Sequence, residues 1–406
     1  MKILRGEIPL TGSKSESNRA LIIQALSKGK IKIQNLSKAA DTVGLQAALQ
    51  NVEKETEQID IGPAGTAMRF LTGYLCLQSG TRELTGSARM QERPIGVLVD
   101  ALHVLGAKIE YLRKPGYPPL RISGPLQQAA ARVKVPGNIS SQYLSALLLI
   151  ASSLPLGLSL EIEGELTSRP YLQMTLKMLE EVGITSIWKG SEIHIPAQDF
   201  NPGTLTIEPD WSAASYWYAI AALSEKADLF LPALKEDSLQ GDQVIKDIMR
   251  AFGIQSSFKD GGLYIQKDEA SALPPLLSFD FTACPDLAQT IIVCCAALKR
   301  PVAFTGLHTL RIKETDRIAA LQNELAKFGV QLLEQTSGVF HMDYQNWYAP
   351  EVLRIKTYED HRMAMAFAPL AMIFKRVEIE DPQVVDKSYP AFWRHLSEFG
   401  ITFHSE

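Results

Sequence analysis

The chain has 406 residues, of which 46% are hydrophobic and 21% are charged, and its formal net charge is −4. These proportions are typical of a soluble protein with two domains of ordinary size, and a negative net charge gives no reason to expect nucleic-acid binding by the bulk surface. The N-terminal residues lack the long apolar stretch of a signal peptide, and the cysteines lie in or beside apolar helical runs. Buried thiols in a cytoplasmic protein are therefore expected.

Six segments share one pattern, in which a strand runs into a short polar loop and the loop opens a strongly apolar helix. They span residues 8–26, 59–77, 133–152, 205–223, 277–298 and 353–372. A fixed internal period indicates one supersecondary unit copied along the chain. Residues 138–160 carry no charge and are about as long as a membrane-spanning helix, but Pro155 and Gly157 interrupt them, so no membrane span is expected.

A second helix, amphipathic in pattern, is expected at residues 94–105, 170–182, 242–252, 315–328 and 391–399. A glycine follows each of these helices as a left-handed stop and leads into a short β-like run. These glycines are Gly106, Gly183, Gly253, Gly329 and Gly400. The first unit is short, because residues 41–61 hold one helix and a polar stretch, and we infer a deletion in its tail.

The predicted fold class is α/β, with six βαβαββ units that each have one buried and one surface helix. Three units in each of two lobes give the symmetric arrangement. We expect one discontinuous lobe of residues 1–12 and 209–406 and a second lobe of residues 13–208. The chain would cross between them near residues 11–13 and 208–210, where a proline-containing segment suits a hinge.

The polar loops at the helix starts carry most of the unusual chemistry. Residues 12–19 (GSKSESNR) place Lys14 and Arg19 among hydroxyl and amide groups at a helix N-terminus, which suits a phosphate group. The spacing is not that of a Walker loop, and the alternative is a simple helix cap. Gly65 opens the next apolar helix and lets a ligand approach the backbone, and residues 89–94 follow with two arginines.

Further along the chain, neutral and charged loops alternate. Residues 140–142 and 168–171 supply hydrogen-bonding groups that suit a hydroxylated ring or the edge of a phosphate, or that only cap helices. Residues 311–317 (RIKETDR) bring three cations and two carboxylates to a helix entry, and residues 360–362 (DHR) begin a very apolar helix. Asp210 and Asp286 are either caps or a base that accepts a hydroxyl proton, and Cys284 is better interpreted as buried filler than as a nucleophile.

The strings GSKSESNRAL, GTAMR, RMQERPIG, SSQYLSALL, SRPY, CPDLAQT, RIKETDRI, TYEDHRMAM and DKSYPAFW, in this order, resemble the EPSP synthase (3-phosphoshikimate 1-carboxyvinyltransferase) family of enolpyruvyl transferases. The resemblance spans nearly the whole chain. It implies a two-lobed fold of six units with the active site in the cleft between lobes. It also implies transfer of the enolpyruvyl group of phosphoenolpyruvate to the 5-hydroxyl of shikimate 3-phosphate, with release of phosphate, in aromatic amino acid biosynthesis.

The family's functional residues carry over onto matching positions of this sequence. The phosphoenolpyruvate ligands match Lys14, Gly65, Arg93, Gln142, Arg317, Arg362 and Lys387. The shikimate 3-phosphate ligands match Ser15, Arg19, Ser140, Ser141, Gln142, Ser168, Tyr171, Asp286 and Lys313. Asp286, Glu314 and Lys14 match the catalytic groups, and Arg69 and His361 match supporting positions. The chain departs from the family pattern at Pro63, Phe70 and Thr309.

The resemblance implies small-molecule substrates, a monomer, and chemistry that requires no metal or redox cofactor. Two rival functions remain open from the sequence. One is the sister transferase acting on UDP-N-acetylglucosamine, although residues 89–94 lack the reactive cysteine typical of it. The other is a non-catalytic anion-binding protein, against which the carboxylates of Asp286 and Glu314 argue, since binding alone does not need them.

Overall fold

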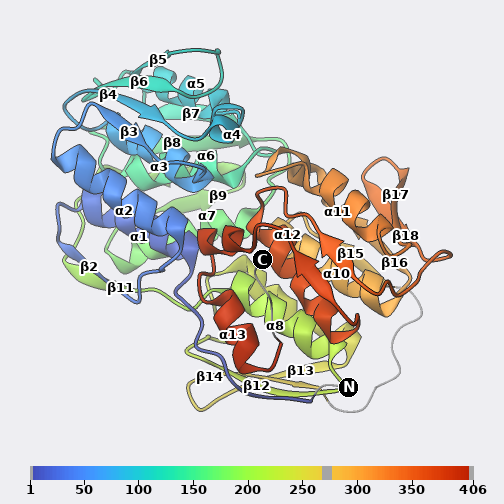
Figure 1. The fold of residues 1–406 in the computed structure, drawn as a ribbon. Coiled ribbons are helices and arrows are strands. Elements are labelled where there is room, and N and C mark those ends of the chain that lie inside the picture. Colours follow the sequence, from blue (N-terminus) through green and yellow to red (C-terminus); the bar gives the residue numbers. More distant parts are fainter. Residues whose placement is uncertain (1–2, 268–276, 402–406) are drawn as a thin grey trace. The chain divides into compact units, whose positions relative to one another are not determined.

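The computed structural model describes residues 3–267 and 277–401 of the chain, which form a mixed α/β structure (Figure 1). The chain divides into two compact units. Unit 1 consists of Met1–Thr11 and Glu208–Glu406, and unit 2 consists of Gly12–Ile207. The α/β fold class predicted from the sequence is confirmed.

Unit 2 contains seven helices and ten strands within the described residues. The helices are α1 (Lys14–Leu26), α2 (Ala40–Glu53), α3 (Gly65–Leu75), α4 (Ala88–Gln91), α5 (Gly96–Val104), α6 (Ser141–Ala151) and α7 (Arg169–Glu181). The strands are β2 (Ile31–Gln34), β3 (Gln58–Asp60), β4 (Gly80–Thr85), β5 (Lys108–Tyr111), β6 (Leu120–Gly124), β7 (Arg132–Pro136), β8 (Leu158–Glu163), β9 (Ile187–Lys189), β10 (Glu192–Ile195) and β11 (Gly203–Thr206).

Unit 1 begins with β1 (Ile3–Glu7) and resumes after the second crossing. Its other strands are β12 (Lys226–Pro232), β13 (Ile254–Lys259), β14 (Gly262–Lys267), β15 (Leu277–Asp280), β16 (Val302–Thr305), β17 (Gln331–Thr336), β18 (Val339–Asp343), β19 (Leu353–Ile355) and β20 (Val377–Ile379). Its α-helices are α8 (Trp211–Leu223), α9 (Ile245–Ile248), α10 (Ala288–Leu298), α11 (Arg317–Ala326), α12 (His361–Phe367) and α13 (Phe392–Glu398). Its 3-10 helices are η1 (Gly241–Val244), η2 (Met249–Phe252), η3 (Pro285–Leu287), η4 (His308–Ile312), η5 (Ala368–Met372) and η6 (Pro382–Lys387).

Four four-stranded sheets share one order of strands, and two further sheets have two strands each. The larger sheets are β3-β4-β6-β5, β7-β8-β10-β9, β1-β12-β14-β13 and β15-β16-β18-β17. In each of them the first two strands are parallel, and the remaining pairs are antiparallel. The small sheets pair β11 with β2 and β19 with β20, in both cases in parallel.

Each chain crossing lies between a strand of one unit and a helix of the other. The N-terminal strand β1 pairs in parallel with β12 of unit 1, although the helix that follows it, α1, belongs to unit 2. Conversely, β11 pairs with β2 in unit 2, although the following helix α8 belongs to unit 1. Each crossing segment is therefore held by backbone hydrogen bonds on one side and by a buried helix on the other.

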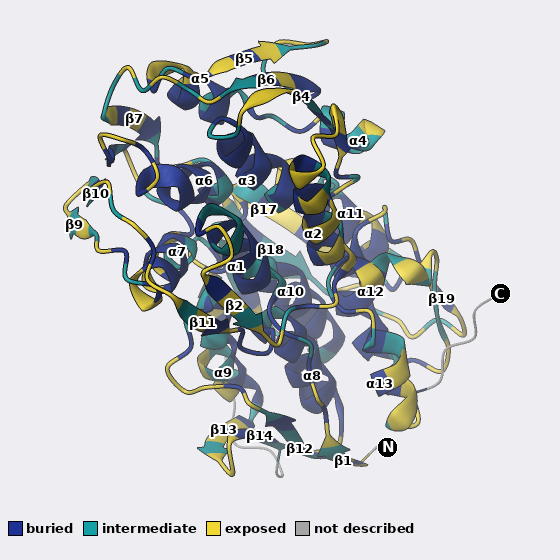
Figure 2. Ribbon diagram, turned by 90° about the vertical axis from the view of Figure 1, so that its left-hand side faces the viewer, coloured by how far each residue is buried: buried dark blue, intermediate teal, exposed yellow. Residues whose placement is uncertain are grey.

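Three apolar helices form the centre of each unit. In unit 2, α3 and α6 pack against each other and against α1, and in unit 1, α8, α10 and α12 pack together. Nearly every residue of α8, α10 and α12 is buried, as the dark colour of α8 and α10 in Figure 2 shows. The amphipathic helices and the sheets cover these central helices. This burial explains the uncharged segment 138–160, and no described helix is long and apolar enough to cross a bilayer.

Most predicted helices are found close to their expected positions, with one correction. The amphipathic segment 242–252 is not a continuous α-helix, because it is divided into η1, a single turn of α9 and η2. The short first unit has α2 followed directly by β3, without a strand pair between them. The β-like run expected after Gly400 lies mostly in residues 402–406, outside the described residues.

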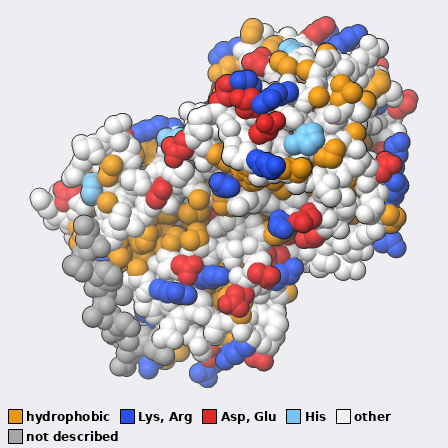
Figure 3. All heavy atoms as spheres, turned by 180° about the vertical axis from the view of Figure 1, so that it is seen from behind, with side chains coloured by type: hydrophobic (Ala, Val, Ile, Leu, Met, Phe, Trp, Pro, Cys, Tyr) orange, Lys and Arg blue, Asp and Glu red, His pale blue; other side chains and the backbone are white. Residues whose placement is uncertain are grey.

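The thiols are buried as predicted, and the surface carries charges of both signs (Figure 3). Basic and acidic side chains are interspersed on the face shown in Figure 3. All four cysteines are free and buried. Burial raises the pKa of the Cys284 thiol above its usual range, so the interpretation of this residue as filler and not a nucleophile is supported.

Two of the left-handed glycines form a matched pair for a stability test. Gly253 and Gly329 have φ of 78° and 76°. A Cβ at Gly253 would meet nothing within 4 Å, whereas a Cβ at Gly329 would lie 1.8 Å from the backbone oxygen of Asn346. We expect Gly253→Ala to lower the free energy of unfolding by about 1–2 kcal/mol, the cost of the left-handed conformation. Gly329→Ala should lower the free energy of unfolding by clearly more. Equal losses of this free energy for the two variants, measured by urea unfolding, would contradict this account.

Candidate active site

The charged residues predicted from the C-terminal half of the sequence meet at the N-terminal ends of helices in unit 1. Asp286 lies in η3, before α10, and Arg317 is the first residue of α11. Asp360 caps α12, and Arg362 is the second residue of that helix. The local sequences place a charge at each helix entry, and packing of the central helices brings these entries together.

Arg317 is the centre of this cluster, with only 1% of its side chain exposed. Its Nε donates to Oδ2 of Asp360 at 2.7 Å and its Nη2 to Oδ1 at 3.3 Å, a bidentate pair. Nη2 also donates to Oε2 of Glu314 at 2.9 Å, and Nη1 lies 3.4 Å from Oδ1 of Asp286. One guanidinium thus contacts three carboxylates, and these charges raise the pKa of Arg317 although burial alone would lower it.

Asp286 joins Arg362 to the cluster. Nη2 of Arg362 donates to Oδ2 of Asp286 at 2.8 Å, and Nη1 donates to the Asp286 backbone oxygen at 3.1 Å. Lys313 lies farther away, with Nζ 3.9 Å from Oδ1 of Asp286. Burial raises the pKa of Asp286, but Arg362, Lys313 and Arg317 outweigh it and hold the pKa well below its usual range.

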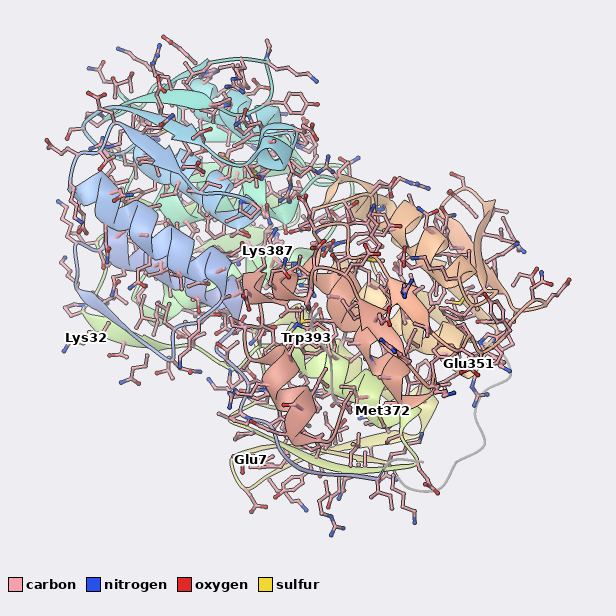
Figure 4. The ribbon with its side chains drawn as sticks, viewed as in Figure 1. Glu7, Lys32, Glu351, Met372, Lys387 and Trp393 are labelled. Atoms are coloured by element: carbon pink, nitrogen blue, oxygen red, sulfur yellow. The ribbon has the colours of Figure 1, made fainter. Side chains whose placement is uncertain are left out.

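Lys387 completes the cluster from the end of η6, which packs beside α12 (Figure 4). Its Nζ lies 3.3 Å from Oε1 of Glu314, so Glu314 bridges Lys387 and Arg317. His361 is buried beside Asp360, with Nδ1 3.6 Å from Oδ1. Four cations and three carboxylates alternate here, which lowers the cost of burying each charge.

The sequence left open whether Asp210 and Asp286 are helix caps or a catalytic base, and the two residues differ in the structure. Asp210 is the N-cap of α8 and accepts from the backbone nitrogen of Ala213 at 2.9 Å. Asp286 caps no helix and instead binds the two arginines. The cap interpretation therefore holds for Asp210 only.

In unit 2, Gly65 and Arg93 are in direct contact. A Cβ at Gly65 would lie 2.5 Å from Nη1 and 2.8 Å from Nη2 of Arg93, so only glycine leaves room for this guanidinium. Arg93 is 7% exposed, and its Nε has no hydrogen-bond partner. No ion pair of Arg93 occurs among the described residues of the chain. A buried cation without a counter-ion is costly, which points to an anionic ligand at this position.

Arg69 and Arg19 are buried too, but their guanidinium groups are used within the unit. Arg69 donates from Nη2 to the oxygen of Pro94 at 2.6 Å and from Nη1 to that of Gly65 at 3.2 Å, so it supports the loop that carries Arg93. Arg19 donates from Nε to Oγ1 of Thr175 at 2.7 Å, and burial lowers its pKa to about 10.

Arg19 also contacts the predicted ligands around it. It donates to the backbone oxygens of Ser15 at 2.8 Å and Tyr171 at 3.3 Å and to Oγ of Ser145 at 3.1 Å. The Phe70 ring, a departure from the family pattern, lies 5.4 Å from its Cζ. In this structure Arg19 holds α1, α6 and α7 together.

The hydroxyl and amide groups predicted from the sequence lie at the starts of α6 and α7. Ser140 caps α6, Ser141 is its first residue, and Nε2 of Gln142 donates to Oγ1 of Thr66 on α3 at 3.1 Å. Ser168 stands at the N-cap of α7 in a left-handed conformation, with φ of 54°, but its side chain makes no cap bond. A non-glycine residue in this conformation is strained, as is common at ligand sites.

Sequence analysis missed several partners in both units. Lys14, the first residue of α1, pairs with Asp41 of α2 at 3.1 Å, and Asp41 stands 27 residues away. The hydroxyl of Ser212 accepts from Nη2 of Arg362 at 3.4 Å and donates to Oδ2 of Asp242. The sequence indicates that Asp41 and Ser212 lie near helix starts, but it does not indicate which residues they contact. No group of three metal-ligating side chains occurs in residues 3–267 and 277–401.

Comparisons with known proteins agree on one family. A family model described as EPSP synthase (3-phosphoshikimate 1-carboxyvinyltransferase) matches residues 1–58 and 45–396. The chain is 45% identical to a 3-phosphoshikimate 1-carboxyvinyltransferase of Bacteroides fragilis, over 98% of this chain and 96% of that protein. It is 36% identical to one of Vibrio cholerae, over 98% and 97%.

Solved structures show the same fold. An EPSP synthase from Acinetobacter baumannii matches with a TM-score of 0.74 at 21% identity, over 99% of this chain and 97% of that chain. The enolpyruvyl transferase NikO from Streptomyces tendae matches with a TM-score of 0.75 at 13% identity, over 98% and 95%.

The unpaired state of Arg93 predicts an unusual response to substitution. Arg93→Met removes a buried cation, so the free energy of unfolding should stay unchanged or rise by about 1 kcal/mol. Arg69→Met is the matched control, since it loses two hydrogen bonds to backbone oxygens and should cost roughly 1–3 kcal/mol. Urea unfolding of both variants measures this, and a larger loss at Arg93 than at Arg69 would contradict it.

Asp242 predicts a dependence of stability on pH. Burial, followed by the charge of Asp286, raises the pKa of this carboxyl to about 7. The unfolded chain ionises the same group near pH 4, so between these values the folded state binds more protons and stability falls as the pH rises. Asp242→Asn should therefore gain stability relative to wild type at pH 8 and much less at pH 5, by urea unfolding. Asp237→Asn, at an exposed position nearby, is the control, and an equal gain at both pH values refutes the assignment.

Proposed function

The chain belongs to the EPSP synthase family, and from this premise we propose that it transfers the enolpyruvyl group of phosphoenolpyruvate to the 5-hydroxyl of shikimate 3-phosphate. The products are 5-enolpyruvylshikimate 3-phosphate and phosphate. The enzyme is a 3-phosphoshikimate 1-carboxyvinyltransferase of the shikimate pathway. It acts on small molecules as a cytoplasmic monomer.

The buried guanidinium of Arg93 is the observation that carries this proposal. It lies against Gly65 and has no counter-ion among the described residues, so a bound carboxylate or phosphate would offset its cost of burial. Both substrates are anions. Together they carry two phosphates and two carboxylates, and several cations are needed to hold them side by side. Holding two reactants in register can lower the barrier by roughly 7–11 kcal/mol.

We assign the substrate ligands by the family's matching positions. Phosphoenolpyruvate is bound by the seven residues that match its ligands, and unit 1 supplies Arg317, Arg362 and Lys387 among them. Shikimate 3-phosphate is bound mainly by the serines of unit 2, with Arg19, Gln142, Tyr171, Asp286 and Lys313.

The ionic network suggests how the catalytic carboxylates become reactive. With its pKa held low by Arg362, Lys313 and Arg317, Asp286 is a weak base in the free protein. Anionic substrates compete with Asp286 and Glu314 for these cations. Once the cations bind substrate, they stabilise the two carboxylate anions less, and both carboxylates become stronger bases. Asp286 then takes the proton of the attacking hydroxyl.

Lys14 and Glu314 manage the second proton. One of them delivers it to the methylene carbon of phosphoenolpyruvate as the oxygen adds to the neighbouring carbon, which gives a tetrahedral intermediate. In the second half of the reaction the methyl group of the intermediate gives one proton back, and the C–O bond to phosphate breaks. The leaving phosphate takes up the proton that was removed from the hydroxyl, which gives the product. Lys14 is paired with Asp41, and Glu314 lies between Lys387 and Arg317.

The test is phosphate release by purified protein with phosphoenolpyruvate and shikimate 3-phosphate, beside a reaction with UDP-N-acetylglucosamine as acceptor. Release is expected only with shikimate 3-phosphate. Glu314→Gln and Asp286→Asn should each lower turnover by about 100-fold or more, as expected for loss of acid–base catalysis, and weaken substrate binding far less.

Other outcomes separate the rival functions. Release with the sugar nucleotide alone would move the assignment to the sister transferase. Binding of both anions without any turnover would support a binding protein. Near-normal turnover of either carboxylate variant would contradict its catalytic role.

A further inference from the structure

Helix α11 contacts the loop before α12 at two points. The first is Arg317, which binds Asp360 at the end of that loop. The second is Glu324, seven residues later and therefore on the same face of the helix, about 10 Å along its axis. Glu324 belongs to neither the predicted site nor the charge cluster, and its side chain is 1% exposed.

The loop between β19 and α12 has a strained backbone. Tyr358 and Glu359 are consecutive non-glycine residues in the left-handed region, with φ of 55° and 56°. Such residues are sparsely populated in this conformation and persist only where the surroundings hold them. The same loop delivers Asp360 and Arg362 to the charge cluster, so its conformation decides where the Arg362 guanidinium lies.

Glu324 supplies the contacts that hold this backbone. Its Oε1 accepts from the hydroxyl of Tyr358 at 2.8 Å, and its Oε2 accepts from the backbone nitrogen of Lys356 at 3.0 Å. Lys327 neutralises the carboxylate, with Nζ 2.6 Å from Oε2, and also donates to the backbone oxygen of Arg354 at 2.9 Å. Each oxygen of Glu324 therefore has a partner in the loop.

We propose that Glu324 is a positioning residue of the phosphoenolpyruvate site, which fixes the loop 356–360 and through it Asp360 and Arg362. The inference rests on the proposed function, since that function makes Arg362 a phosphoenolpyruvate ligand. Asp360 transmits the position, because its Oδ1 accepts from the backbone nitrogen of Arg362 at 2.9 Å while both of its oxygens bind Arg317. Loss of the Glu324 contacts removes the second of the two points at which α11 holds the loop.

The experiment compares three variants of the full chain. Glu324→Gln weakens both loop contacts, and Tyr358→Phe removes one hydroxyl. Tyr348→Phe is the matched control, because the Tyr348 hydroxyl also donates to the end of α11, at the backbone oxygen of Lys327 (2.7 Å), but it lies outside the loop. Hydrogen exchange of amides 356–362, the KM for phosphoenolpyruvate and the Kd for shikimate 3-phosphate are measured for each.

Tyr358→Phe should raise the KM for phosphoenolpyruvate roughly threefold to tenfold, the usual effect of one hydrogen bond, and Glu324→Gln should raise it further. In both, exchange of amides 356–362 quickens, while the Kd for shikimate 3-phosphate measured alone and all values of Tyr348→Phe stay within twofold of wild type.

An unchanged KM for phosphoenolpyruvate in Glu324→Gln overturns the inference, even if the loop exchanges faster, because the role would then be structural only. An equal loss of shikimate 3-phosphate affinity overturns it as well. If the wild-type protein releases no phosphate, the proposed function is contradicted. The effect of Glu324 on the loop is then judged by hydrogen exchange alone, and unchanged exchange in Glu324→Gln refutes the inference.

Discussion

The pair between Arg317 and Asp360 is the interaction on which the rest of unit 1 depends. Four cations close to one another repel, and each loses hydration energy when it is buried. Asp360 offsets the charge of Arg317 through two hydrogen bonds and at the same time caps α12. Asp286 and Glu314 then balance the remaining cations. The charges of the cluster thus hold one another in place, which lowers the cost of orienting these groups during a reaction.

Unit 2 stabilises its buried cations in another way. Its buried residues Arg19 and Arg69 donate to neutral oxygens, and Lys14 is paired with the carboxylate of Asp41. Arg93 is left with glycine on one side and without a counter-ion in the described part of the chain. A preformed cation of this kind is unfavourable for the stability of the folded protein and favourable for binding an anion. We interpret the difference as a division of roles. Unit 1 contains buried charges that are paired with one another, whereas unit 2 contains a buried cation, Arg93, without a counter-ion among the described residues.

The repeated architecture explains why these groups gather. Each central helix begins after a parallel strand or a polar loop, and its apolar body is buried on all sides by its neighbours and the covering sheets. The charged side chains of these helices lie in the first two turns, near the free backbone N–H groups of the helix start. The charges are therefore confined to the helix entries by the same burial that stabilises the core, and Glu324 extends this control to the loop that leads into α12.

Local features could be predicted from the sequence alone: the starts of the apolar helices, the cap Asp210, the left-handed glycines and the α/β class. These depend on neighbouring residues and on periodicity, so they can be read from a single chain. The family strings predicted the site residues and the repeat pattern predicted the lobe boundaries, and both remain predictions. The segment 242–252 was misjudged because an amphipathic pattern does not distinguish an α-helix from a run of short 3-10 turns. Which charged groups are neighbours is visible only in the three-dimensional fold. Lys14 is paired with Asp41, Arg19 donates to Thr175, which lies 156 positions away, and Arg93 has no carboxylate partner among the described residues. The fold also shows that β1 pairs with β12 and β11 with β2. Such pairings depend on how the buried helices pack and where the chain crosses, and no local pattern in the sequence encodes that geometry.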